Sequence, residues 1–157
     1  MVTGRHGKNR RANGPAEPDH DEACGARRRA VELLDEMLAM SPEVDEAVRA
    51  CAGPPPFGAG LARLVSGYAR QIYLARRELS GLPISSDLRD RVEEQLSFRQ
   101  QMLEQGLLLA FRSHGPRTER IREQLVYGLG PAAAGLGSLV EQAHRELDEP
   151  DEGRRGP

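Results

Sequence analysis

Apolar residues recur at helical spacing along most of the chain, most clearly over residues 61–79 and 88–111. Spacings of three and four residues place apolar side chains on one face of a helix. The break between the two stretches, residues 81–86, contains a proline and a serine pair, which are typical of a helix end followed by a helix cap. The pattern therefore predicts a helical hairpin at the centre of an all-helical protein.

The same spacing predicts further helices on both sides of this hairpin. Before it, residues 23–40 and 42–52 carry apolar stripes, and a Ser-Pro pair between them is typical of a helix start. After it, we expect short helices at residues 118–127 and 131–147. The predicted fold class is all-α, a compact bundle of five to six helices around the central hairpin. The apolar residues of the second hairpin helix cover more than half of its circumference, so we expect neighbours on several sides of it.

The apolar material is concentrated in residues 22–147, which predicts one helical domain in a chain of 157 residues. Residues 1–21 form a basic stretch rich in glycine and proline, and residues 148–157 are equally poor in apolar side chains. Such segments bury too little surface to offset the entropy of ordering them. We therefore expect disordered tails at both ends.

The amino-acid composition argues against several classes of protein. The 22 basic and 24 acidic residues nearly balance, which argues against a general polyanion binder. Lys8 is the only lysine, and this arginine bias is typical of a GC-rich bacterial genome. Cys24 and Cys51 are far apart and both sit on or beside an apolar stripe, which favours packed, free thiols in a reducing cytoplasm. The uncharged stretch 125–140 is too short to span a membrane and is interrupted by glycine and proline, and no secretory signal is expected.

Three arginines of the first hairpin helix form the main candidate binding site. Arg63, Arg70 and Arg77 recur every seven residues, opposite the apolar stripe of that helix. Leu74 lies beside this row, although it is a large apolar side chain on a polar face. Guanidinium groups bind carboxylates and phosphates through paired hydrogen bonds. The neighbouring leucine favours a protein partner over nucleic acid.

The second hairpin helix contains two residues that break its pattern. Arg99 projects into the apolar face with Gln95 one turn before it, and a buried arginine needs a carboxylate, solvent, a ligand or another subunit. Leu108 lies on the polar face of the same helix. The first anomaly is compatible with a small-molecule sensor that holds its ligand at Arg99 and Gln95. The second suggests, together with Leu74, a further contact surface and a possible homodimer.

Two other patterns point to weaker alternatives. Arg112, Arg117 and Arg120 surround a glycine-containing turn between two helices, the outline of a DNA-binding helix-turn-helix in a transcriptional regulator. Glu141 and His144 have the Glu-x-x-His spacing of di-iron bundles, but no second such pair occurs in the predicted helical domain, residues 22–147.

Residues 75–107, with the junction GLPISSD, resemble the middle of the all-helical chorismate mutases. That family requires a long uninterrupted first helix with a catalytic arginine and a lysine close to it. Here residues 53–56, Gly-Pro-Pro-Pro, interrupt that region, and Lys8 is the only lysine. No residue role is therefore transferred from the family.

These patterns predict a cytoplasmic, non-enzymatic interaction or regulatory module that binds a protein partner. No metal, cofactor or catalytic residue is predicted, because no acid–base or nucleophile pair follows from the spacing. Side chains on helices distant in sequence are outside what spacing can predict.

Overall fold

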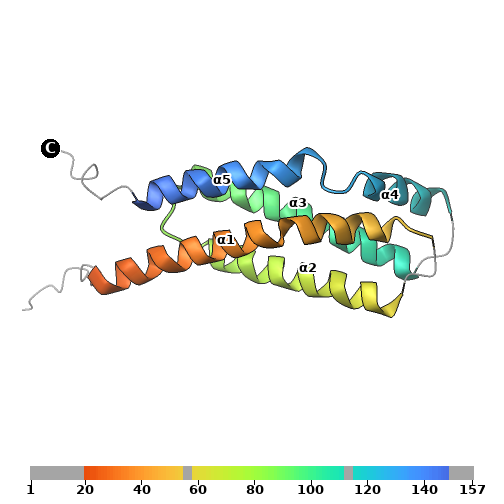
Figure 1. The fold of residues 1–157 in the computed structure, drawn as a ribbon, viewed down its shortest axis with the longest axis horizontal. Helices are drawn as coiled ribbons and strands as arrows, with labels where there is room; N and C mark the ends of the chain where they lie inside the picture. Colours follow the sequence, from red (N-terminus) through yellow and green to blue (C-terminus); the bar gives the residue numbers. More distant parts are fainter. Residues whose placement is uncertain (1–19, 55–57, 112–114, 149–157) are drawn as a thin grey trace, which may run out of the picture.

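The computed structural model describes residues 20–54, 58–111 and 115–148, and these residues form five α-helices and no strand. The all-α prediction is confirmed, and the number of described helices lies within the expected five to six. The helices are α1 (His20–Cys51), α2 (Ala59–Leu79), α3 (Ser86–Phe111), α4 (Pro116–Val126) and α5 (Pro131–Asp148) (Figure 1). Within the described residues, every helix is too short or too polar to cross a bilayer.

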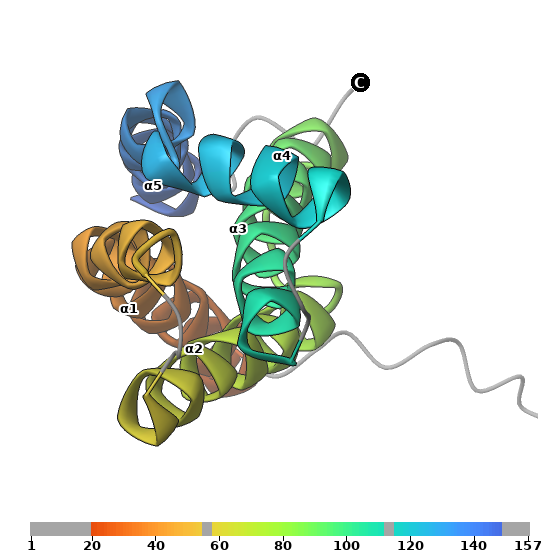
Figure 2. The same ribbon diagram turned by 90° about the vertical axis from the view of Figure 1, so that its right-hand side faces the viewer.

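The helices run alternately up and down along one long axis (Figure 1). α1 and α3 point one way and α2 points the other, while α4 and α5 follow one another as a broken fourth arm. α1 and α3 each contact all the other helices, whereas α2 contacts only these two. Viewed from the end, α1, α2, α3 and α5 surround a common core (Figure 2). α3 has neighbours on several sides, as its wide apolar face predicts, and α1 shares that position.

α1 is one continuous helix, so the prediction of two helices separated at the Ser-Pro pair is wrong. Pro42 lies inside the helix, where its missing N–H and its ring cost about 3 kcal/mol. The buried stripe continues across this position, with Met37 before the proline and Val44 after it. Each buried side chain of this kind contributes about 1.5–3 kcal/mol. Packing on both sides of Pro42 therefore outweighs the local cost of the proline.

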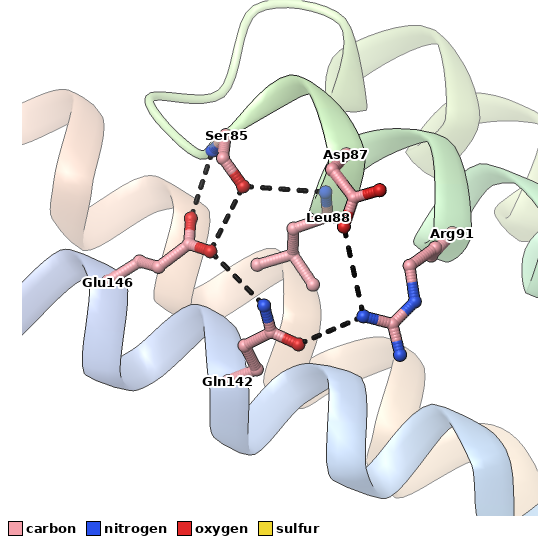
Figure 3. Close-up of polar contacts among 6 residues, drawn as sticks. All are labelled: Ser85, Asp87, Leu88, Arg91, Gln142 and Glu146. Atoms are coloured by element: carbon pink, nitrogen blue, oxygen red, sulfur yellow. Dashed lines mark hydrogen bonds and ion pairs between the residues drawn. The ribbon is translucent and has the colours of Figure 1, made fainter.

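A polar cluster fixes the start of α3 against α5 (Figure 3). Ser85 Oγ accepts a hydrogen bond from the Leu88 N–H at 3.4 Å and so caps the helix, as the sequence predicts. Both carboxylate oxygens of Glu146 accept from Ser85, one from its N–H and one from its hydroxyl, each at 3.0 Å. One turn further along α3, Arg91 donates to Gln142 Oε1 at 3.2 Å. The turn of the hairpin is thereby held to the fourth arm of the bundle.

The turn between α4 and α5 depends on glycine. Gly128 and Gly130 have φ angles of 62° and 54°, in the left-handed region that other residues rarely adopt. A Cβ on Gly128 would also lie 2.3 Å from Asp45 Oδ1 of α1. That same oxygen accepts a hydrogen bond from the Leu129 N–H at 2.6 Å. The turn is therefore attached to α1, and the fourth arm breaks where it makes this attachment.

Several other expectations require correction. His20 and Asp21 belong to α1 and Asp148 belongs to α5, so the predicted tails 1–21 and 148–157 were drawn too wide. The expectation of disorder over the rest of those tails concerns residues outside the described ranges. Leu64 and Phe98 fall within the apolar stretches 61–79 and 88–111, which predicts burial, but they are 47% and 38% exposed. Both lie at the edge of their stripe, where the neighbouring helix does not cover them.

Gly106 of α3 packs directly against Cys51 of α1. An added Cβ would lie 2.7 Å from the Cys51 Sγ and 3.1 Å from its Cβ. We expect Gly106→Ala to lower the free energy of unfolding by about 1–3 kcal/mol, because a tight core contact is overpacked. Gly67→Ala is the matched control, since nothing lies within 4 Å of its Cβ position. That variant should gain about 0.5–1 kcal/mol from helix propensity. Urea unfolding of the two variants checks the difference, and equal effects would contradict the contact.

Candidate functional site

The arginine ridge, defined here as Arg63, Arg70 and Arg77, lies exposed along the outer face of α2. The buried residues Val65 and Ile72 face the opposite way, into the bundle. Among the described residues, no carboxylate forms an ion pair with any of the three ridge arginines.

Arg76 of the same helix, in contrast, has hydrogen-bond and ion-pair partners within the protein. It donates to Glu93 Oε1 at 2.8 and 2.6 Å and to Gln100 Oε1 at 2.7 Å. These contacts join α2 to α3 inside the molecule. The ridge arginines point away from both neighbouring helices, so their donors remain available to another molecule.

A groove with a volume of about 690 Å³ runs between α1 and α2 beside the ridge. Leu33, Met37 and Met40 line its α1 side, and Leu74 and Ala75 line its α2 side. Leu74 is 48% exposed, so it is available at the edge of this groove. Methionine side chains adapt their shape to an apolar surface placed against them. The groove is therefore apolar along its floor and open to solvent.

Two polar contacts span this groove and set the alignment of its helices. At one point, Arg29 of α1 donates to both carboxylate oxygens of Glu78, at 2.5 and 3.0 Å. The hydrogen bond from Arg29 lowers the pKa of Glu78, and the carboxylate in turn raises the pKa of the arginine. Further along, the Tyr68 hydroxyl donates to Glu43 at 2.8 Å, and this hydrogen bond raises the pKa of Tyr68. These two contacts determine which residues of α1 and α2 lie at the same height, that is, at the same position along the bundle axis.

Leu108 is also exposed, at 41%, but it lies far from Leu74. The 2.6 Å ion pair of Arg76 with Glu93 marks one common height of the antiparallel helices α2 and α3. Leu74 is two residues from Arg76, whereas Leu108 is fifteen residues beyond Glu93 in the same direction. At 1.5 Å per residue, the two leucines are about 20 Å apart along the bundle. A compact patch around Leu74 does not include Leu108.

Arg99 is buried, with 1% of its surface exposed, and it connects three helices. Its NH1 donates to the backbone oxygen and to Oε1 of Gln95 on α3, both at 3.0 Å. Its NH2 donates to Ser41 Oγ of α1 at 3.3 Å and to the Ala132 carbonyl of α5 at 2.7 Å. Its Nε–H has no partner among the described residues.

Arg99 has no carboxylate within ion-pair distance in the described part of the chain. Burial lowers its pKa, and the more distant charge of Asp45 partly opposes that shift. Asp45 itself holds Arg49 at 2.6 Å and the Leu129 N–H. Hydrogen bonds to neutral groups, supported by Asp45, therefore stabilise the buried cation. Because the terminal N–H groups serve these contacts, little donor capacity remains for a ligand at Arg99 and Gln95.

The structure places the remaining candidates apart from this surface. Arg117 and Arg120 are exposed on α4, while Arg112 lies outside the described residues. Glu141 is exposed, and His144 Nε2 lies 3.0 Å from Asp35 Oδ1 on α1 without hydrogen-bond geometry. No group of three metal-ligating side chains occurs in the described ranges.

Sequence reasoning missed some exposed apolar residues. Val126 and Tyr127 are 57% and 77% exposed at the end of α4, although both belong to the uncharged stretch 125–140. Leu125 and Leu129 on either side are buried. The glycines that follow Tyr127 were the available signal, because a chain that turns at Gly128 and Gly130 does not continue one buried face.

No family model matches the chain, and neither a curated protein nor a solved structure is similar to it.

The two described cysteines differ in access. Cys24 is exposed, contrary to its expected packing role, whereas Cys51 is buried and burial raises its thiol pKa to about 11. We expect a thiol reagent at pH 8 to modify Cys24 alone in the folded protein and both cysteines after unfolding. Cys24→Ser should leave the folded protein unreactive; rapid modification of that variant would contradict burial of Cys51.

The raised pKa of Cys51 also makes stability depend on pH. Ionisation of Cys51 favours unfolding, so the free energy of unfolding should fall as the pH rises from about 9 towards 11.

Replacement of Arg99 tests whether its buried hydrogen bonds stabilise the fold more than an exposed arginine does. We expect Arg99→Ala to lower the free energy of unfolding by about 3–5 kcal/mol, because acceptors on three helices lose their donor and a cavity remains. Arg99→Met keeps most of the volume and removes the buried charge, so its loss should be smaller. The control is Arg91→Ala, since Arg91 is 52% exposed and should contribute at most about 1 kcal/mol. Chemical denaturation gives all three values. Equal losses for Arg99→Ala and Arg91→Ala would exclude the connecting role.

Proposed function

We propose that this protein is a non-enzymatic interaction module that binds another protein through the arginine ridge and Leu74. The observation that carries the proposal is the row of three exposed arginines with no carboxylate partner among the described residues, beside an exposed leucine at an apolar groove. Exposed cations adjoining a partly apolar surface are typical of protein interfaces, where arginine is enriched.

The chemistry of the surface indicates what kind of partner fits it. Successive ridge arginines are seven residues apart, or about 10 Å along the helix. A partner that presents carboxylates at this interval beside apolar side chains would satisfy both the guanidinium donors and Leu74. A partner that extends along the whole ridge would also reach the height of Leu108, which is level with the Arg63 end.

The alternatives have less support. A ligand sensor at Arg99 and Gln95 would need donors that already hold the bundle together. A DNA-associated regulator would rely on Arg117 and Arg120, which share a helix with Glu119 and Glu123 and lack an accompanying basic face. A reducing, cytoplasmic location remains part of the proposal, supported by the two free cysteines.

The combined substitution Arg70→Glu with Leu74→Asp tests the interface. It should abolish binding of the protein partner, because it reverses a central ridge charge and places a carboxylate at the groove edge. The measurement is quantitative capture of partners from extracts of the native cells, with helix content checked by circular dichroism. Arg120→Glu with Val126→Asp is the matched control, since it makes the same kinds of change on another exposed surface. Identical capture profiles for wild type and for the Arg70/Leu74 variant would refute the proposal.

A further inference from the structure

The α1 side of the groove carries charges opposite to those of the ridge. We define the acidic stripe as Glu32, Glu36, Glu43 and Glu46. Glu36 and Glu43 line the groove, and the side chains of Glu32 and Glu36 are 53% and 60% exposed. Glu43 and Glu46 are also exposed residues. Arg29 lies 3.7 Å from both Glu32 and Glu36 and neutralises part of this charge, which leaves the stripe acidic as a whole.

The two polar contacts across the groove show which residues of α1 and α2 share a height. Arg29 contacts Glu78, and Glu43 contacts Tyr68. Midway between these contacts, Glu36 is level with residue 73 of α2. Because the helices are antiparallel, a residue that follows Glu36 on α1 is level with the residue that precedes position 73 on α2 by the same number of positions, and the reverse holds for residues before Glu36.

The levels of the stripe match those of the ridge. Glu32, four residues before Glu36, is level with Arg77, and Glu46, ten residues after it, is level with Arg63. Arg70 is level with Ala39, between Glu36 and Glu43. Arg77 and Arg63 therefore each have an acidic residue at their own height, and Arg70 lies at a height between two of them, although ridge and stripe lie on the outer sides of two different helices.

We infer that the partner of the ridge is the acidic stripe of a second copy of this chain, an inference that rests on the proposed protein-binding function of the ridge. A two-fold axis along the groove places α1 of each copy over α2 of the other at equal height. Arg77 then faces Glu32, Arg63 faces Glu46, and Arg70 faces Glu36 and Glu43, and each contact occurs twice. The two Leu74 side chains meet the partner's half of the groove.

Two two-fold axes can bring the groove faces of two copies together, and the charges of the ridge and the stripe favour the axis along the groove. A two-fold axis across the groove would place α1 over α1 and α2 over α2. The acidic stripes would then face each other, as would the arginine ridges, and like charges at an interface are strongly disfavoured. The axis along the groove is therefore the arrangement in which both charge patterns are complementary.

The area of this dimer interface indicates how tightly the two copies should bind. The matched segments span fourteen residues, about 21 Å, and two adjacent helices are about 20 Å wide. The footprint of about 400 Å² per copy, or about 800 Å² in total, is below the roughly 1,200–2,000 Å² of a standard specific interface and is typical of a weak contact. The dimer should therefore dissociate on dilution, and it should weaken with salt because its ion pairs are partly exposed.

Charge exchange between the two surfaces tests the inference. The acidic variant Arg63→Glu/Arg70→Glu and the basic variant Glu36→Arg/Glu46→Arg should each remain monomeric by sedimentation at concentrations where wild type dimerises. Mixed in equal amounts, they should form a heterodimer, because the ridge of one then meets a compatible stripe on the other. The variant with all four substitutions should recover the homodimer. Arg117→Glu/Arg120→Glu changes the net charge as much as the acidic variant does, and should dimerise like wild type.

Each outcome supports or overturns the pairing. Wild type that stays monomeric, or a mixture that gives no heterodimer although both variants retain wild-type helix content, would overturn it. If wild type is monomeric while Arg70→Glu/Leu74→Asp still loses a captured protein, the ridge binds a different partner and only this inference fails. If the ridge variants change neither the mass nor the captured proteins, the proposed function fails as well.

Discussion

The buried guanidinium of Arg99 is the interaction on which the arrangement of the helices depends. It is the one charged side chain in the described core, and it joins α3 to α1 at Ser41 and to α5 at the Ala132 carbonyl. Taking a cation out of water costs several kcal/mol unless its donors are satisfied. Four hydrogen bonds from its terminal nitrogens satisfy all of its donors except the Nε–H. The two that reach Ser41 and Ala132 form only when α1 and α5 are correctly aligned with α3. Polar contacts of this kind can define one packing among several that similar apolar surfaces would allow.

A second polar centre complements this one. Asp45 receives the backbone N–H of the glycine turn and the guanidinium of Arg49, and its charge favours the protonated state of Arg99. The continuous α1 carries both Ser41 and Asp45, four residues apart, so one helix positions the groups that hold α3 and the fourth arm. This explains why an internal proline is tolerated between them. The polar groups around Arg99 and Asp45 contact one another inside the bundle, whereas the arginine ridge on the outer face of α2 has no carboxylate partner among the described residues.

The sequence predicts those features of the fold that depend on neighbouring residues. The extents of α2, α3 and α5 and the Ser85 cap follow from apolar spacing and cap chemistry, and they agree with the structure to within a few residues. The continuity of α1 was not predicted, because the local cost of Pro42 is visible in the sequence and the packing that outweighs it is not. Even so, the stripe keeps its phase from Met37 to Val44.

The candidate site shows the same division between local and tertiary information. Helical spacing alone places Arg63, Arg70 and Arg77 on an exposed face. The groove beside them, the height of each glutamate relative to each arginine, and the separation of Leu74 from Leu108 depend on how the helices are aligned. That alignment is set by contacts such as Arg29 with Glu78 and Arg76 with Glu93, between residues far apart in the chain. No spacing rule within one helix contains this information.

The glycine turn that attaches the fourth arm to α1 also divides that arm energetically. Only Thr118 and Leu125 of the eleven residues of α4 are buried, whereas five side chains of α5 are buried. A helix with so little buried apolar surface has little free energy to resist local opening. We therefore expect α4 to open locally at a lower free-energy cost than the other four helices. In terms of cooperativity, we expect α4 to be the least stable unit of the domain beside a four-helix core.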